Sequence, residues 1–79
     1  MAATSRIERN PDVMLGKPVI RGTRIPVELV LRKLGEGATN ADLIDMYPRL
    51  TEGDIRAVQI FAADTIAHEE TVLLDVAAG

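Results

Sequence analysis

Aliphatic residues recur at helical spacing from residue 27 onward. The first set follows the i, i+3, i+4, i+7 pattern of an amphipathic helix and consists of Val27, Val30, Leu31 and Leu34. Pro26 suits the first helical position, because the N–H that proline lacks would have no partner there. Gly35 or Gly37 supplies the C-terminal stop. The pattern predicts a first helix that must bury one face.

A second helix is predicted to open at Thr39. Asp42 follows three residues later, so each residue can satisfy the other's backbone N–H in a short version of the capping box. The apolar side of this helix consists of Leu43, Ile44 and Tyr47. Pro48 disfavours the helical conformation at Tyr47, so we expect a helix of about two turns.

The same signal returns at Thr51 and Asp54 and predicts the start of a third helix. Its apolar stripe consists of Ile55, Val58, Phe61, Ala62, Thr65 and Ile66. We expect this helix to run to about His68. A short helix, a break at proline and a longer helix have the outline of a helix-turn-helix.

The residues before the helices predict a miniature β-hairpin. The β-prone pairs 19–20 and 24–25 are separated by Arg21-Gly22-Thr23, and Gly22 can take the positive φ that a tight reversal needs. Pro18 and Pro26 cannot donate to a sheet ladder, so both strands must be short or lie on an edge. Residues 7–9 are a further candidate for a short strand, because Asn10-Pro11-Asp12 is a strong turn signal.

These elements predict one domain of the mainly α class, with a short N-terminal β-hairpin followed by three helices. Residues 1–6 are expected to form a flexible N-terminus, residues 7–68 the domain, and residues 69–79 a C-terminal tail. The tail could continue the helix or form an extended segment, and its β-branched residues favour the extended form. Its apolar residues are candidates for binding a partner: Val72, Leu73, Leu74 and Val76.

The composition of the chain argues against most kinds of catalytic site. The 79 residues include no cysteine and one histidine, His68, which with Asp64 offers two ligands where a metal site needs more. No phosphate-binding loop is present, so we expect no enzymatic activity, no cofactor and no bound metal. No apolar run approaches the roughly 20 residues of a membrane span, and the absence of cysteine agrees with a cytoplasmic location.

The charge is distributed unevenly along the chain. Residues 1–34 hold seven Lys or Arg against three acids, whereas residues 35–79 hold two against nine, which returns the net charge of −3. This asymmetry indicates an anionic partner for the first half, a cationic partner for the second, or attraction between the halves within a molecule or dimer. A chain of this size also makes a homodimer plausible.

Arg21 and Arg24 flank the predicted hairpin turn and are the main candidate binding residues. Two guanidinium groups on a constrained turn can bind a phosphate or a partner's carboxylates. Alternatively, they are solvated or pair with acids of the C-terminal half. Thr51 and Arg56 are the candidates for DNA contact at the start of the third helix, although Glu52 and Asp54 beside them repel phosphate.

The chain resembles the domain-of-unknown-function family 433 of small bacterial and archaeal proteins. The resemblance rests on the run GKPVIRGTRIPV at residues 16–27 and extends from about residue 7 to residue 63. Further matching positions are Val30, Leu31, Leu34, Gly37, Asp42 to Ile44, Tyr47, Pro48, Leu50, Thr51, Asp54 and Ile55. The resemblance implies a homeodomain-like three-helix fold preceded by short strands.

The resemblance also implies a function, because family members are often encoded beside a PIN-like ribonuclease toxin and regarded as its antitoxin. In that case an arginine, Arg21 or Arg24, enters the toxin's carboxylate cluster, or the apolar tail lies on the toxin while the arginines face DNA phosphate. The alternatives are a DNA-binding regulator without a toxin, whose hairpin arginines and Arg6 or Arg9 contact the backbone, and a structural dimerisation module.

Overall fold

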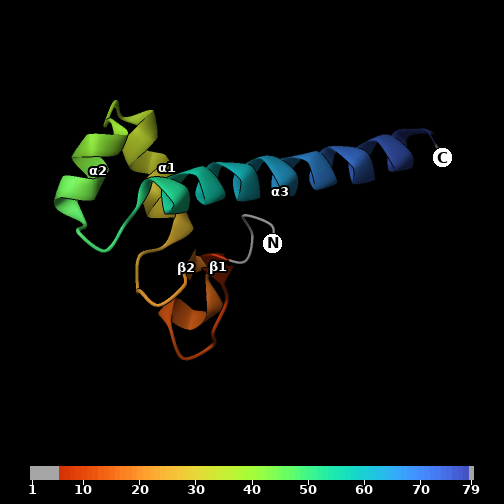
Figure 1. Cartoon of the computed structure of the whole chain (residues 1–79). Coiled ribbons are helices and arrows are strands. Elements are labelled where there is room, and N and C mark those ends of the chain that lie inside the picture. Colours follow the sequence, from red (N-terminus) through yellow and green to blue (C-terminus); the bar gives the residue numbers. More distant parts are fainter. Residues whose placement is uncertain (1–5, 79) are drawn as a thin grey trace.

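The computed structural model describes residues 6–78, with the side chains described as far as residue 69. Along the chain it contains strand β1 (Ile7–Glu8), a 3₁₀ turn (Met14–Gly16), strand β2 (Val19–Ile20) and helices α1 (Val27–Gly35), α2 (Asn40–Met46) and α3 (Glu52–Ala78). Figure 1 shows the strands below the point where α1 and the start of α3 meet. The mainly α class with a short N-terminal hairpin is confirmed.

The pairing within the hairpin differs from the prediction. Strand β2 pairs antiparallel with β1, with Ile7 opposite Ile20 and Glu8 opposite Val19. Residues 24–25 are not a strand, and they contribute only the Ile25 carbonyl oxygen, which accepts a hydrogen bond from the Ile20 N–H at 3.0 Å. The next residue, Pro26, forms an isolated antiparallel bridge with Val19 but has no N–H to extend a ladder. This side of β2 therefore stays a single bridge, and the second strand of the sheet is residues 7–8.

Helix α1 begins one residue later than predicted, because Pro26 precedes the helix as its cap. The Val27 N–H donates to the carbonyl oxygen of Pro18 at 2.9 Å, which ties the helix start to the hairpin. At the other end Gly37 has a φ of 106°, and its N–H donates to the Leu34 carbonyl oxygen. The predicted glycine stop is therefore provided by Gly37, just after the helix.

Both predicted capping boxes are present. The Asp42 N–H donates to Thr39 Oγ1 at 3.0 Å, and the Thr39 N–H donates to Asp42 Oδ2 at 2.9 Å. The Thr39 backbone N–H, and after it the Thr39 side chain, lower the pKa of Asp42 below its ordinary value, because hydrogen bonds to the carboxylate favour its charged form. Thr51 and Asp54 exchange the corresponding pair of bonds, both at 3.1 Å.

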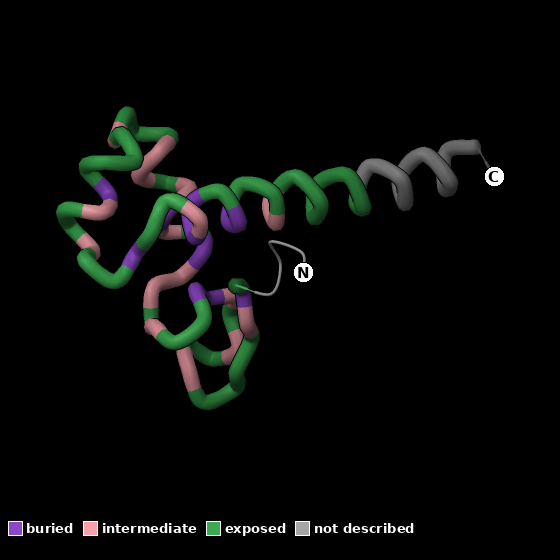
Figure 2. The backbone as a smooth tube through the Cα atoms, viewed as in Figure 1, coloured by how far each residue is buried: buried purple, intermediate pink, exposed green. Residues whose placement is uncertain are grey.

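The core lies where the hairpin, α1, α2 and the first half of α3 meet (Figure 2). Its most deeply buried side chains are aliphatic: Val19, Ile20, Val30, Leu43, Leu50, Ile55 and Val58. Along α3 burial ends early, since the described side chains from residue 63 to residue 69 are all exposed. Residues 63–69 of α3 therefore add no buried side chain to the core.

Helix α3 continues well past the predicted end at His68. It runs to Ala78, so the tail that was expected to be extended has a helical backbone. The reason is that no glycine or proline follows Gly53 until residue 79, and β-branched residues disfavour a helix by less than about 1 kcal/mol each. The 27 residues of α3 correspond to about 40 Å of helix. Among the described residues no helix is both long and apolar enough to span a bilayer.

Candidate functional site

The turn that presents Arg21 and Arg24 is rigidly built. The Ile20 carbonyl oxygen accepts hydrogen bonds from the Thr23 N–H at 3.0 Å and from Thr23 Oγ1 at 2.8 Å. Thr23 Oγ1 in turn accepts from the Ile25 N–H at 3.0 Å. Gly22 takes a φ of 77°, which suits the third position of a type II turn. Both arginines are exposed, as a binding role requires.

Arg24 shares a surface hollow with a second arginine that the sequence did not indicate. The hollow has a volume of about 570 Å³, and Arg24, Arg49 and Glu8 contribute its charged side chains. Arg49 lies between α2 and α3 and is far from Arg24 in the sequence, so only the fold brings the two together. Arg21 is not among the residues that line this hollow. Two guanidinium groups against one carboxylate leave the hollow suited to an anion.

The first turn of α3 is occupied by structural contacts. Asp54 is buried, with 8% of its surface exposed, and its Oδ1 accepts a hydrogen bond from Arg6 Nη1 at 3.1 Å in an ion pair. The Arg6 guanidinium covers Gly53, where an added Cβ would lie 3.0 Å from its central carbon. Glu52 Oε1 accepts from Asn40 Nδ2 at 3.0 Å. Residues 52–54 are therefore engaged within the molecule.

The candidate DNA contacts Thr51 and Arg56 are both exposed. Thr51 Oγ1 already accepts the Asp54 N–H, so one lone pair and the hydroxyl proton remain, of which only the proton can bind a phosphate oxygen. Arg56 lies one turn beyond Gly53 and forms no ion pair with any side chain in residues 6–69. Of the two, Arg56 is the better placed to contact a phosphate.

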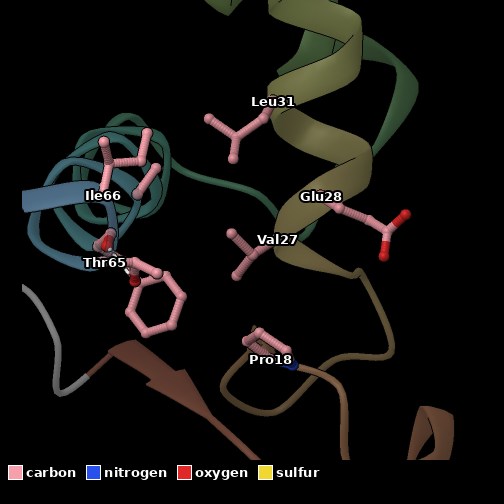
Figure 3. Close-up of a pocket in the computed structure, with 8 residues that line it drawn as sticks. Pro18, Val27, Glu28, Leu31, Thr65 and Ile66 are labelled. Carbon is pink, nitrogen blue, oxygen red and sulfur yellow. Dashed lines mark hydrogen bonds between the residues drawn. The ribbon is translucent and has the colours of Figure 1, made fainter. Parts of the chain in front are cut away.

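An apolar groove of about 260 Å³ lies between α1 and α3 (Figure 3). Its apolar lining consists of Pro18, Val27, Leu31, Phe61, Ala62 and Ile66. Figure 3 shows Leu31 and Val27 on α1 facing Ile66 across the groove, whereas Glu28 points away from α3. Ile66 is 57% exposed. The helical spacing of the third apolar stripe predicted Ile66 on the packed face, but in the monomer it borders an open groove.

The candidate residues of the tail, Val72 to Val76, have side chains outside the described part of the structure. Among the described residues, no group of three or more His, Cys, Asp or Glu side chains is arranged to hold a metal ion. Every buried side-chain N or O atom among the described residues has a hydrogen-bond partner. The arginine hollow and the apolar groove are the candidate binding features of the described surface.

Comparisons with known proteins agree with the resemblance of the sequence. The chain is 34% identical over 61 residues to the uncharacterized protein y4eO of Sinorhizobium fredii (strain NBRC 101917 / NGR234), a match that covers 77% of this chain and 28% of the relative. The chain thus spans between a quarter and a third of that protein.

A solved structure has the same fold. The crystal structure of a DUF433 member protein from Anabaena variabilis ATCC 29413 superimposes with a TM-score of 0.73 at 29% identity, covering 87% of this chain and 68% of that one. The family model for proteins of unknown function DUF433 matches residues 7–62, from the first strand to the groove-lining part of α3. The chain therefore belongs to the DUF433 family.

Proposed function

We propose that this protein is a cytoplasmic, antitoxin-type binding protein that neutralises a PIN-like ribonuclease and also contacts DNA. The observation that carries the proposal is the separation of two surfaces on one small fold. The arginine turn lies on the body, whereas the second half of α3 extends away from α1 and α2 (Figure 1). A protein with two such surfaces can engage a protein partner and a nucleic acid at the same time.

The shape supports one of the two antitoxin arrangements. A PIN-type site is a cluster of metal-binding carboxylates, so Arg21 or Arg24 would have to reach into it from the turn. That turn is short and hydrogen-bonded back to Ile20, whereas α3 has exposed side chains through residue 69. We therefore assign the C-terminal half of α3, with the apolar residues Val72, Leu73, Leu74 and Val76, to the toxin. The arginines are assigned to phosphate.

Co-expression with the PIN-like reading frame beside the gene tests the toxin-binding role. We expect the wild-type chain to relieve growth arrest and to co-purify with the ribonuclease. Replacement of both Leu73 and Leu74 by serine should abolish both effects, because a helix that binds in a groove does so through its apolar residues. Circular dichroism should show the fold unchanged, since the core ends before residue 63.

The matched control is Asp75→Asn, which changes a polar residue in the same segment and should retain rescue. If the wild-type chain neither binds nor relieves the neighbouring ribonuclease, the antitoxin proposal is wrong. If the serine variant rescues as well as the wild type, the toxin contacts another surface. A neighbouring locus that encodes no PIN-like protein would favour the regulator without a toxin.

DNA contact through the arginine hollow is the second function, and the pairing of Arg24 with Arg49 favours it. Each phosphate contact that is lost should reduce the slope of log K against log salt by about 0.9. The double variant Arg24→Ala/Arg49→Ala is therefore expected to flatten the slope for duplex DNA by about 1.8. Fluorescence anisotropy across a salt series measures this change.

The control for the DNA experiment is Arg32→Ala, which removes an exposed arginine on α1, outside the hollow. It should leave the slope unchanged. A double arginine variant with the wild-type slope would exclude the hollow as a phosphate site. If the same variant instead lost thermal stability without any change in binding, the arginines would be structural, as a plain dimerisation module requires.

A further inference from the structure

The arginine hollow contains a carboxylate that phosphate binding alone does not use. Glu8, Arg24 and Arg49 are its charged residues, and none of their side chains forms a hydrogen bond or an ion pair within the described part of the chain. A lone phosphate would be repelled by the Glu8 carboxylate. A carboxylate and two guanidinium groups around one hollow instead fit a ligand that carries both a negative charge and N–H donors.

We infer that the hollow binds an unpaired guanine nucleotide, with its phosphate on Arg24 and Arg49 and its base on Glu8. The inference deepens the proposed function, because it rests on the assignment of these arginines to phosphate and names the nucleotide that they hold. The volume of about 570 Å³ falls within the roughly 300–1,000 Å³ of small-molecule sites. The hollow therefore has room for more than a phosphate group.

The lining of the hollow is divided in the same way as a nucleotide. Arg24 and Arg49 are exposed, whereas Glu8, Val13 and Ile25 are half-buried. The phosphate of a nucleotide is charged and strongly hydrated, while its base has two apolar faces and a polar edge. The exposed arginines therefore suit the phosphate. The half-buried residues suit the base, because two aliphatic side chains can cover its faces and one carboxylate can bind its edge.

Glu8 favours guanine over the other bases. An ionised carboxylate only accepts hydrogen bonds, and it does so through two oxygens. The Watson–Crick edge of guanine presents two adjacent donors, the ring N–H and the exocyclic amino group. Adenine and cytosine present one amino donor beside an acceptor nitrogen, and uracil presents one N–H between two carbonyl oxygens. A base pair would occupy this edge, so the guanine must be unpaired.

The fold holds the three charged residues in place from three separate segments. Glu8 lies on β1, where it is paired with Val19 of β2. Arg24 directly follows the hydrogen-bonded turn. Arg49 precedes Leu50, whose side chain is buried in the core. Because these segments are anchored before any ligand arrives, binding requires little ordering of the backbone.

Chemical-shift titration of the isotope-labelled full chain with guanosine and uridine 5′-monophosphates tests the inference. Each ligand carries one phosphate, so a difference in affinity reports on the base. The guanine nucleotide should bind about tenfold more tightly, since a two-point contact with a base edge gives discrimination of this order. A single-stranded hexanucleotide with one guanine among uracils identifies the source. Tighter binding than the mononucleotide indicates a nucleic-acid strand, and equal binding indicates a free nucleotide.

Glu8→Gln is the decisive variant, because it replaces one acceptor oxygen with a donor at nearly constant size. It should remove the preference for guanine and bind the uridine nucleotide at least as tightly as the wild type does. The matched control is Glu69→Gln, which changes an exposed carboxylate on α3, outside the hollow. It should keep the tenfold preference of the wild type.

Equal affinity of the wild type for the two nucleotides overturns the inference, and so does a Glu8→Gln variant that keeps the preference. Glycine binding at lower concentration than either nucleotide would assign the hollow to a zwitterion and would also overturn it. The DNA proposal fails separately, through an unchanged salt slope for duplex DNA in the double arginine variant. Guanine selectivity combined with that unchanged slope would support a nucleotide site that does not serve duplex binding.

Discussion

Replacing Ile55 by alanine is expected to lower the free energy of unfolding by about 2–5 kcal/mol. The Ile55 side chain has no exposed surface and belongs to the core cluster shared by the hairpin and all three helices. The loss combines the transfer free energy of the missing carbons with the cavity that they leave. Small domains have total stabilities at the low end of about 5–15 kcal/mol, so much of the variant should be unfolded at modest urea concentrations.

Urea titration followed by circular dichroism, at one fixed protein concentration, measures the effect of Ile55→Ala. The fixed concentration matters because any self-association would make the apparent stability depend on concentration. Ile60→Ala is the control, since Ile60 lies on the same helix five residues later but is 40% exposed. Ile60→Ala should lower the free energy of unfolding much less than Ile55→Ala does. If the two variants lost equal stability, the packing of α3 would differ from that described.

Asp54→Ala is expected to have the second largest effect, a loss of about 1.5–3 kcal/mol. The Asp54 carboxylate accepts the Thr51 N–H at 3.1 Å, which caps α3. It also pairs with Arg6, which holds the residue before β1 against the start of the helix. Because Asp54 is 8% exposed, its removal takes the acceptor from the Thr51 N–H and from the Arg6 guanidinium, and the part-buried backbone N–H does not recover its hydrogen bond fully from water.

Arg6→Ala should lower the free energy of unfolding by less than Asp54→Ala does. The reason is that the Arg6 side chain is 51% exposed, so solvent partly screens its ion pair. Asp54→Asn should also cost less, since the amide oxygen can still accept the backbone N–H. Urea unfolding of Arg6→Ala, Asp54→Ala and the double variant gives the coupling free energy between the two side chains. The assignment of Asp54 as the main structural element of the pair would be wrong if Arg6→Ala were the more damaging change.

The helices could be predicted from the sequence because their signals are local. A threonine with an aspartate three residues later marks the start of both α2 and α3, and both capping boxes are present. The end of α3 was predicted incorrectly, since β-branched residues in the tail were given more weight than the absence of glycine and proline. The partner of β2 was also predicted incorrectly, because strand pairing depends on which segment reaches the open edge.

The candidate site could be predicted only in part. Arg21 and Arg24 were indicated by their place beside a glycine turn, and the structure shows both exposed on it. No sequence pattern indicated Arg49 as a site residue, because its proximity to the turn depends on how the connection between α2 and α3 packs. Glu52 and Asp54 looked unfavourable for DNA contact because acidic side chains repel phosphate. The ion pair of Asp54 with Arg6, 48 positions away in the sequence, supplies a structural reason for this residue.

The sequence by itself determined the mainly α class, the positions at which the helices begin and the glycine turn that presents two arginines. Each of these depends on interactions between residues a few positions apart. Only the tertiary structure decided that β1 completes the hairpin, that Arg49 joins Arg24, and that an apolar groove remains open beside Ile66. These features require segments distant in the chain to meet, and their free energy comes from burial shared among the hairpin, α1 and α3.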